Sequence, residues 1–455
     1  MGKGGYFVLT NNTSISWKRD RDTSYTYQME CDFPATVSPY SSTSVYFEFL
    51  DGFFKDSEDD SAKIKYQNDN TADSFIIHFF YVNNSFQVQV DISQLHIPDR
   101  STVDLHWWHT TNDQHLFPFT LSYYDGQFYC ETSDMSNWMS KHYNLISSKS
   151  LSEICIPGSH DSGMSLINGS TAFVTSDNVL TQSKDIYNQL KAGVRYFDIR
   201  PGIGNGGQLV CVHYSNVAHT DRYVGANGQD LTSIVNDINR FSAEFPCEVI
   251  ILNLSHAMQT DKDYRSLNDS EWDKVFNLLR NIKFLCNAED FAQTNKNFSK
   301  IPISNILSKG RVICFLSDTI SNPPKFIFPN KVDDKSVIYD SFSDSADFDS
   351  VKKDQIQKMK DHSRDSYFIL SWTLTQPVKD AILGPIGTSI EQLARHANGG
   401  LGPIIFDIAQ DSFPHVIYTD YCTEYVSNIA LAINFQLEKL NQSKLIQSKI
   451  ESKLN

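Results

Sequence analysis

The chain has few cysteines, no long apolar run, and no tract of like charges or of glycine and serine. Its eight cysteines are scattered, without a CxxC pair or a dense framework, so we expect reduced thiols and no zinc site. No stretch of about 18 apolar residues occurs, and the N-terminus lacks a basic start followed by an apolar run. We therefore expect a soluble, cytoplasmic protein, with leaderless export as the alternative.

Positive charge is also scarce. Lysine and arginine total 39 against 54 aspartates and glutamates, which gives a net charge of -15. Because this charge repels polyanions, no nucleic-acid partner is expected. The composition, 40% hydrophobic and 13% aromatic, is typical of an ordered globular protein, and 455 residues exceed the usual size of one domain. We therefore expect two domains.

Residues 1–143 show the signals of β-strands. Val45, Phe47 and Phe49 alternate with polar neighbours, which places one face of a strand on a core and the other in water. Further strand-like runs lie at 74–82, 86–92 and 103–109. The pattern predicts an all-β domain, an antiparallel sandwich, whose expected role is membrane or ligand binding. Its histidines have no metal-ligand spacing and are interpreted as surface or satisfied core residues: His78, His96, His106, His109 and His115.

Residues 144–455 alternate between strand and helix patterns. Short apolar runs indicate strands at 194–199, 249–254, 312–316, 367–373 and 404–406. Helical spacing indicates helices at 234–245 and 272–279 and a closing helix at 421–440. Repeated strand–helix units imply a parallel sheet, and this many units favour a closed barrel. The predicted fold class is α/β, a distorted TIM-type (β/α) barrel preceded by an all-β sandwich.

The densest chemical signal is the segment 156–163, in which glycine and serine flank His160 and Asp161. Small neighbours leave an imidazole uncovered and let a ligand approach the backbone. A histidine in such a loop is, by itself, more often a hydrogen-bonded turn residue than a catalyst.

Two further segments carry charged groups. The apolar strand at 193–200 places Asp198 and Arg200 on one face, where the arginine could grip a phosphate or form a structural ion pair with the aspartate. A short strand then ends at His213. Transfer of a phosphodiester to a neighbouring hydroxyl needs a base, an acid and a cation, which two imidazoles and a guanidinium supply.

These motifs occur in a recognisable order. The segment 156–163, the helix with Gln189 followed by 193–200, the strand ending at His213, and 248–254 together resemble the catalytic X region of phosphatidylinositol-specific phospholipase C. The resemblance is to its bacterial-type, single-barrel, metal-independent members, and it runs from about residue 151 to 254 and more loosely to 420. The first 140 residues are distantly similar to small membrane- or sugar-binding β-sandwiches.

The resemblance implies a role for each motif residue. His160 would be the general base on the inositol 2-hydroxyl, and His213 the general acid toward the diacylglycerol oxygen, giving a cyclic inositol phosphate. Arg200 would hold the phosphate, Asp161 would assist it and the leaving group, and Asp198 would orient the neighbouring charges.

The resemblance also implies a carboxylate that hydrogen-bonds the base histidine. Asp420 matches it and would fix the tautomer of His160 and favour its charged form. Asp407 and Asp411 are close enough in the sequence to be rivals.

The same positions bear on a metal. Calcium-dependent relatives place an asparagine after the histidine and several carboxylates on the following strands, because a hard cation needs oxygen ligands. Here Asp161 replaces the asparagine, Arg200 occupies a carboxylate position, and Ser255 with His256 stands where a third carboxylate would be. The resemblance therefore implies calcium independence, with no metal and no cofactor.

Headgroup recognition departs from the family. His256 and Ser317 stand where bacterial relatives have a lysine and an arginine that help to bind inositol. Asp340 would match an acidic residue that binds inositol hydroxyls. The alternative is a loop carboxylate that is simply solvated. Trp372 would line the pocket or, as the more common alternative, pack inside the barrel.

Three functions were weighed. The leading hypothesis is an enzyme that cleaves phosphatidylinositol, with a glycosyl-phosphatidylinositol anchor as a second candidate substrate, in peripheral contact with a membrane. The alternative is a lipid- or glycan-binding protein with a weak or inactive barrel. A barrel like that of glycerophosphodiesterases or sphingomyelinase D would need paired carboxylate metal ligands after the first histidine, and the sequence does not show them.

Overall fold

The computed structural model describes most of the chain: residues 3–49, 60–82, 85–98, 100–106, 115–131, 134–172, 174–216, 222–317, 320, 322–377 and 387–454. Two compact units emerge, one made of 1–132 with 395–408, the other of 133–394 with 409–455. The division into 1–143 and 144–455 drawn from the sequence stays a prediction. None of the described helices is long and apolar enough to cross a membrane.

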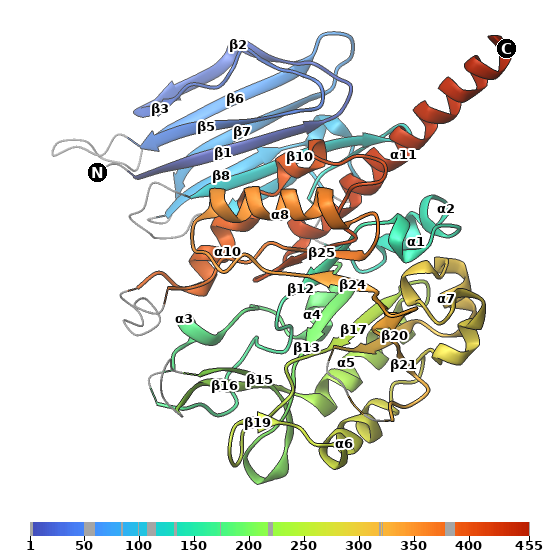
Figure 1. The fold of residues 1–455 in the computed structure, drawn as a ribbon. Coiled ribbons are helices and arrows are strands. Elements are labelled where there is room, and N and C mark those ends of the chain that lie inside the picture. Colours follow the sequence, from blue (N-terminus) through green and yellow to red (C-terminus); the bar gives the residue numbers. More distant parts are fainter. Residues whose placement is uncertain are drawn as a thin grey trace. The chain divides into compact units, whose positions relative to one another are not determined.

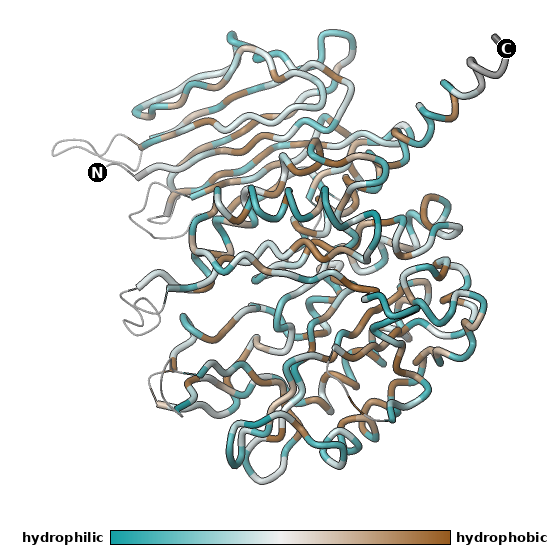
Figure 2. The backbone as a smooth tube through the Cα atoms, viewed as in Figure 1, coloured by the Kyte–Doolittle hydropathy of each residue, from teal (hydrophilic) through white to brown (hydrophobic). Residues whose placement is uncertain are grey.

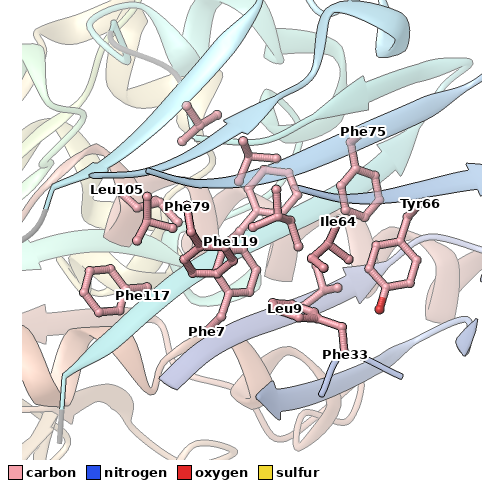
Figure 3. Close-up of a cluster of buried hydrophobic side chains, with 14 of the residues drawn as sticks. Phe7, Leu9, Phe33, Ile64, Tyr66, Phe75, Phe79, Leu105, Phe117 and Phe119 are labelled. Atoms are coloured by element: carbon pink, nitrogen blue, oxygen red, sulfur yellow. The ribbon is translucent and has the colours of Figure 1, made fainter. Parts of the chain in front are cut away.

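The first unit is a sandwich of two β-sheets (Figure 1). One sheet has the order β11 (Gln127–Tyr129), β10 (Leu116–Tyr124), β1 (Lys3–Asn12), β5 (Ser41–Phe49), β3 (Met29–Cys31). The other has the order β4 (Thr36–Val37), β2 (Trp17–Tyr27), β6 (Ser61–Asn68), β7 (Ser74–Val82), β8 (Ser85–Asp91), β9 (Thr102–His106). Aromatic side chains of the two sheets meet in the core. The ring of Phe79 on β7 lies 4.6 Å from that of Phe47 on β5. It lies 6.2 Å from the ring of Phe7 on β1, and Figure 3 shows both of these side chains. The predicted sandwich is confirmed.

Two details of this unit differ from the prediction. β1 and β10 run parallel, whereas the sequence predicted an antiparallel sandwich. Before β10 the chain forms strands β6 to β9 of the second sheet, and β10 then returns to the first sheet beside β1 in the same direction. The apolar run 404–406 is also not a strand, because it forms the 3₁₀-helix η8 (Gly402–Phe406), which packs on β1, β5 and β10. A short apolar run does not by itself distinguish these structures.

The second unit is built on a sheet of eight parallel strands. Their order is β21 (Ile327–Phe328), β20 (Val312–Leu316), β17 (Ile250–Leu254), β13 (Tyr196–Ile199), β12 (Ile156–Ser159), β26 (Val416–Thr419), β25 (Tyr367–Ser371), β24 (Ile338–Asp340). Every residue of β17 and β20 is buried, as expected for parallel strands covered on both faces, and Figure 2 colours much of this sheet hydrophobic. Within the described residues β21 and β24 do not pair, so the barrel is distorted and open there. The predicted (β/α) barrel is confirmed.

The helices of this unit are α1 (Trp138–Lys141), α2 (Tyr143–Ile146), α3 (Ser176–Val179), α4 (Ile186–Lys191), α5 (Leu231–Glu244), α6 (Asp269–Leu279), α7 (Ile303–Lys309), α8 (Phe348–His362) and α11 (Glu424–Leu454). A further helix, α10 (Ile390–Gly399), begins in this unit and ends in the sandwich unit. α5 begins where the Asp230 carboxylate accepts hydrogen bonds from the amides of Thr232 and Ser233, and it buries the predicted apolar stripe. The closing helix α11 is longer than predicted.

A smaller sheet lies beside the barrel strands. Its order is β16 (Tyr223–Asp230), β15 (Leu209–Asn216), β14 (Pro201–Ile203), β18 (Met258–Gln259), β19 (Arg265–Ser266). The strand expected to end at His213 is β15; it continues to Asn216 and pairs antiparallel with β14 and β16. A separate hairpin joins β22 (Lys331–Val332) to β23 (Lys335–Ser336). His213 therefore comes from this smaller sheet and not from a barrel strand.

Candidate active site

Three polar residues follow directly on three neighbouring strands. β12 pairs with β13 on one side and with β26 on the other. His160 comes immediately after β12, Arg200 after β13 and Asp420 after β26. Parallel strands end at the same edge of a sheet, so these residues, distant in the sequence, meet at one mouth of the barrel.

His160 is held from both sides of its ring. Its Nδ1 lies 2.6 Å from Asp420 Oδ1, and its Nε2 lies 2.8 Å from Arg200 Nη2. A guanidinium only donates hydrogen bonds, so Nε2 is an acceptor and the ring proton resides on Nδ1. Burial alone would lower the pKa of His160, but the Asp420 carboxylate outweighs it and the pKa is raised. The result is an imidazole with a fixed tautomer, whose Nε2 lone pair faces Arg200.

Arg200 is oriented by Asp198. Its Nε donates to Asp198 Oδ2 at 3.0 Å, and its Nη1 lies 3.3 Å from Asp161 Oδ2. The guanidinium is 15% exposed, so it faces the mouth of the barrel while two carboxylates hold it. Burial alone would raise the pKa of Asp198, yet Arg200 and the hydrogen-bond donors around it hold that pKa well below its usual range. Asp198 is therefore a fixed anion that aims Arg200.

Asp161 and His213 form a second pair. His213 Nδ1 lies 3.1 Å from Asp161 Oδ2, the same oxygen that faces Arg200. Burial raises the pKa of Asp161 to about 7, whereas burial and the nearby Arg200 and His160 lower the pKa of His213 to about 3. Below about pH 7 Asp161 therefore holds a proton, and above about pH 3 the neighbouring His213 ring is neutral.

The backbone turns sharply where these residues lie. Asp161, His256 and Tyr421 have φ angles of 42°, 50° and 46°, in the left-handed region that favours glycine. Each follows the polar residue at the end of a barrel strand: His160, Ser255 or Asp420. Strained non-glycine residues that persist at one edge of a fold are typical of functional sites.

The two arginines of the segment 193–200 have different roles. Arg195 is fully buried, and its Nη2 lies 2.6 Å from a carboxylate oxygen of Glu248. The same carboxylate accepts hydrogen bonds from the amides of Met139 and Ser140. This pair ties α1 to the barrel, which leaves Arg200 as the arginine of this segment that faces the site.

Sequence analysis missed two hydroxyl groups. Tyr418 donates to Asp198 Oδ2 at 2.7 Å, and Ser255 donates to Asp198 Oδ1 at 2.5 Å. The signal for Tyr418 was present: it lies on β26 two residues before Asp420, which follows that strand directly, so alternation predicts that both face the same side. Ser255 was noted only as replacing a carboxylate, and nothing in its sequence context indicated a partner.

An amide also missed by the sequence joins two strand ends. Gln182 Nε2 donates to the carbonyl oxygens of His160 at 2.8 Å and Thr419 at 3.1 Å. Its Oε1 accepts from the amide of Cys422 at 3.0 Å. The turns after β12 and β26 are therefore pinned to each other beside the His160–Asp420 pair.

The three predicted substrate-binding residues lie in different environments. His256 is exposed, and its Nδ1 lies 2.9 Å from Ser255 Oγ. Asp340, at the end of β24, is also exposed at the mouth, where partial desolvation and then the charge of Asp198 raise its pKa to about 6. Trp372 is 1% exposed and packs edge-on against Phe348, which is the packing alternative. The binding roles of all three stay predictions.

The remaining candidates lie outside this cluster. The rival Asp411 pairs with Arg364 at 2.8 Å on the surface, and Asp407 follows η8 in the sandwich unit. Ser317 donates to Asn253 at 2.8 Å. Of the sandwich histidines, His109 and the side chain of His106 lie outside the described residues. All eight cysteines are free thiols. No group of three or more metal-ligating side chains occurs among the residues that the model describes.

Comparison with known proteins gives partial matches. No family model matches the chain. A 1-phosphatidylinositol phosphodiesterase of Staphylococcus aureus is 36% identical over 140 residues, 31% of this chain and 38% of that protein. A PI-PLC X-box domain-containing protein of Dictyostelium discoideum is 28% identical over 177 residues, 34% of this chain and 22% of that protein. The chain thus spans well under half the length of these relatives, which confirm the resemblance to the X region.

Solved structures were also found. A mutant phosphatidylinositol-specific phospholipase C from Staphylococcus aureus covers 66% of this chain and 96% of its own, with 21% identity and a TM-score of 0.47. The phosphatidylinositol-specific phospholipase C from Listeria monocytogenes covers 66% of this chain and 98% of its own, with 19% identity and a TM-score of 0.45.

Proposed function

We propose that this protein cleaves the glycerol–phosphate bond of phosphatidylinositol by internal transesterification, releasing diacylglycerol and inositol cyclic phosphate. The observation that carries the proposal is His160, fixed between Asp420 and Arg200, with an Nε2 lone pair that accepts a hydrogen bond from Arg200. The curated relatives named 1-phosphatidylinositol phosphodiesterase support the substrate class.

The first step uses His160 as a base. Its Nε2 takes the proton of the inositol 2-hydroxyl, and the resulting imidazolium is stabilised by Asp420 at Nδ1. A bound phosphate replaces His160 Nε2 as the acceptor for Arg200 Nη2, so substrate binding frees the base. The 2-oxygen attacks phosphorus, and Arg200 neutralises the charge that develops on the phosphoryl oxygens.

The second half of the step protonates the leaving group. As the bond from phosphorus to the glycerol oxygen breaks, that oxygen takes a proton from the Asp161–His213 pair through the His213 ring. Arg200 contacts Asp161 as well as His160, so one cation links the base side to the acid side. This mechanism needs no metal ion, because the Arg200 guanidinium neutralises the charge that develops on the phosphoryl oxygens.

Purified protein is expected to release cyclic inositol phosphate from phosphatidylinositol vesicles equally well with and without a calcium chelator. Phosphorus NMR of the soluble product identifies the cyclic ester, and a glycosyl-phosphatidylinositol anchor is tested in the same way. Loss of all activity on chelation would reject the metal-free mechanism. Binding to the vesicles without product, in both conditions, would favour the lipid-binding alternative.

The pH profile of kcat/KM is expected to be bell-shaped. His160 must be neutral, so activity falls as pH drops through its pKa, which is raised above 6.5. The Asp161–His213 pair must hold a proton, so activity also falls as pH rises above about 7.

Asp420→Asn is expected to move the acid limb to lower pH, because it removes the charge that raises the pKa of His160. The basic limb should move in the same direction by less, because Asp420 is the last of the causes that raise the pKa of Asp161. The maximum value of kcat/KM should fall about tenfold or more, because the tautomer of His160 is less firmly fixed. Measuring kcat/KM from pH 5 to 9 for both proteins checks this, and an unmoved acid limb would contradict the assignment of His160 as the base.

A further inference from the structure

Ser255 lies between two groups of the site. The residue is 3% exposed. Its hydroxyl donates to Asp198 Oδ1 at 2.5 Å and lies 2.9 Å from His256 Nδ1. A hydroxyl has one proton to donate, and an ionised carboxylate only accepts. The Ser255 proton is therefore committed to Asp198, so Nδ1 of His256 must be the donor to Ser255.

The hydrogen bonds continue to the phosphate-facing cation. Asp198 accepts from Ser255 on Oδ1, and on Oδ2 it accepts from Tyr418 and from Arg200 Nε. The backbone supports the same connection, because the Ser255 amide donates to the carbonyl of Ile199, the residue before Arg200, at 3.0 Å. An unbroken chain thus runs from an exposed imidazole, through Ser255 and Asp198, to Arg200.

The conformation of His256 fits a functional constraint. Its φ of 50° is unfavourable for a residue with a Cβ, and the following Ala257 is buried, so the turn is fixed on both sides. A solvated side chain on an ordinary loop would not need this backbone. The strained turn holds Nδ1 against Ser255 while the ring stays exposed at the strand edge.

We propose that Ser255 is a positioning residue that couples His256 to Arg200. When the inositol headgroup contacts His256, the hydrogen bonds from Asp198 to Arg200 become stronger. Part of the binding energy of the headgroup then raises kcat and does not lower KM. This coupling rests on the proposed function. Through it, His256 affects kcat by way of Ser255, which does not contact the substrate.

A double-mutant cycle tests the coupling. His256→Ala is expected to lower kcat about tenfold in the wild-type background and less than about twofold once Ser255→Ala is present. Tyr418→Phe is the matched control: it removes the other hydroxyl from Asp198 but leaves the link to His256, so the tenfold effect should persist. Ser255→Thr keeps a hydroxyl and should restore the dependence on His256. Equal effects of His256→Ala in all backgrounds, or an effect confined to KM, would overturn the proposal.

A measurement without lipid separates this proposal from the function. Nitrogen-15 NMR of the imidazoles in the full-length protein should show a proton on Nδ1 of His256 in the wild type and in Tyr418→Phe. An unprotonated Nδ1 in the wild type would overturn the hydrogen-bond chain, whatever the protein does to phosphatidylinositol. A protonated Nδ1 in a protein that yields no cyclic product would contradict the proposed function while supporting the chain.

Discussion

Replacing His160 or His213 with alanine is expected to lower kcat on phosphatidylinositol by about 10²–10⁴-fold, because each change removes one proton-transfer group from the reaction. His160→Ala leaves Asp420 and Arg200 without the imidazole between them, so the proposed base is lost. His213→Ala removes the ring next to Asp161, so the leaving oxygen loses its proposed proton donor. Initial rates of cyclic phosphate release measure both losses.

The control for these variants is His78→Ala. His78 lies on β7 of the sandwich unit, so its loss should leave turnover near the wild-type value. Circular dichroism and thermal unfolding establish that all three variants are folded. A folded His160 or His213 variant that keeps near-normal turnover on the natural lipid would show that the role assigned to that residue is wrong.

Arg200→Lys is expected to lower kcat/KM by about 10²–10³-fold, although the charge is kept. The guanidinium contacts three groups at once: Nε contacts Asp198, Nη1 contacts Asp161, and Nη2 contacts His160. A single ammonium nitrogen cannot make these contacts in the same plane. Most of the loss should appear in kcat, because the charge that Arg200 neutralises develops in the transition state.

Arg240→Lys is the matched control for this substitution. Arg240 is 63% exposed and pairs with Glu244 on the surface of α5, so the same chemical change there should have little effect. Near-wild-type turnover of Arg200→Lys would show that a point charge suffices and would remove the argument for a planar grip on the phosphate.

The fold could be predicted from sequence where periodicity is strong. Alternation at Val45, Phe47 and Phe49 identified β5, and the repeated strand and helix patterns after residue 144 identified the barrel. Pairing partners were harder, because they depend on contacts between distant segments. The run 404–406 was assigned to a strand but forms η8, and the strand of His213 could not be assigned to a sheet, because a local pattern does not show which sheet a segment joins.

The site was predictable in its residues but not in its electrostatics. The resemblance indicated His160, Asp161, Arg200, His213 and Asp420, and the structure brings these five residues together. The raised pKa of Asp161 arises from burial, which sequence spacing does not reveal. Tyr418 and Ser255 were missed because a hydroxyl has a role in a site only through the group that it contacts. That group is Asp198, and the sequence does not show that either hydroxyl lies next to it.

The place of β26 in the sheet has a consequence for biosynthesis. This strand is inserted between β12 and β25 and carries Asp420, which lies 260 residues after the histidine that it orients. A nascent chain that has emerged only as far as residue 415 contains His160, His213 and Arg200, but it lacks the carboxylate that holds Nδ1 of His160. The site is therefore completed only when β26 joins the sheet between its two neighbours.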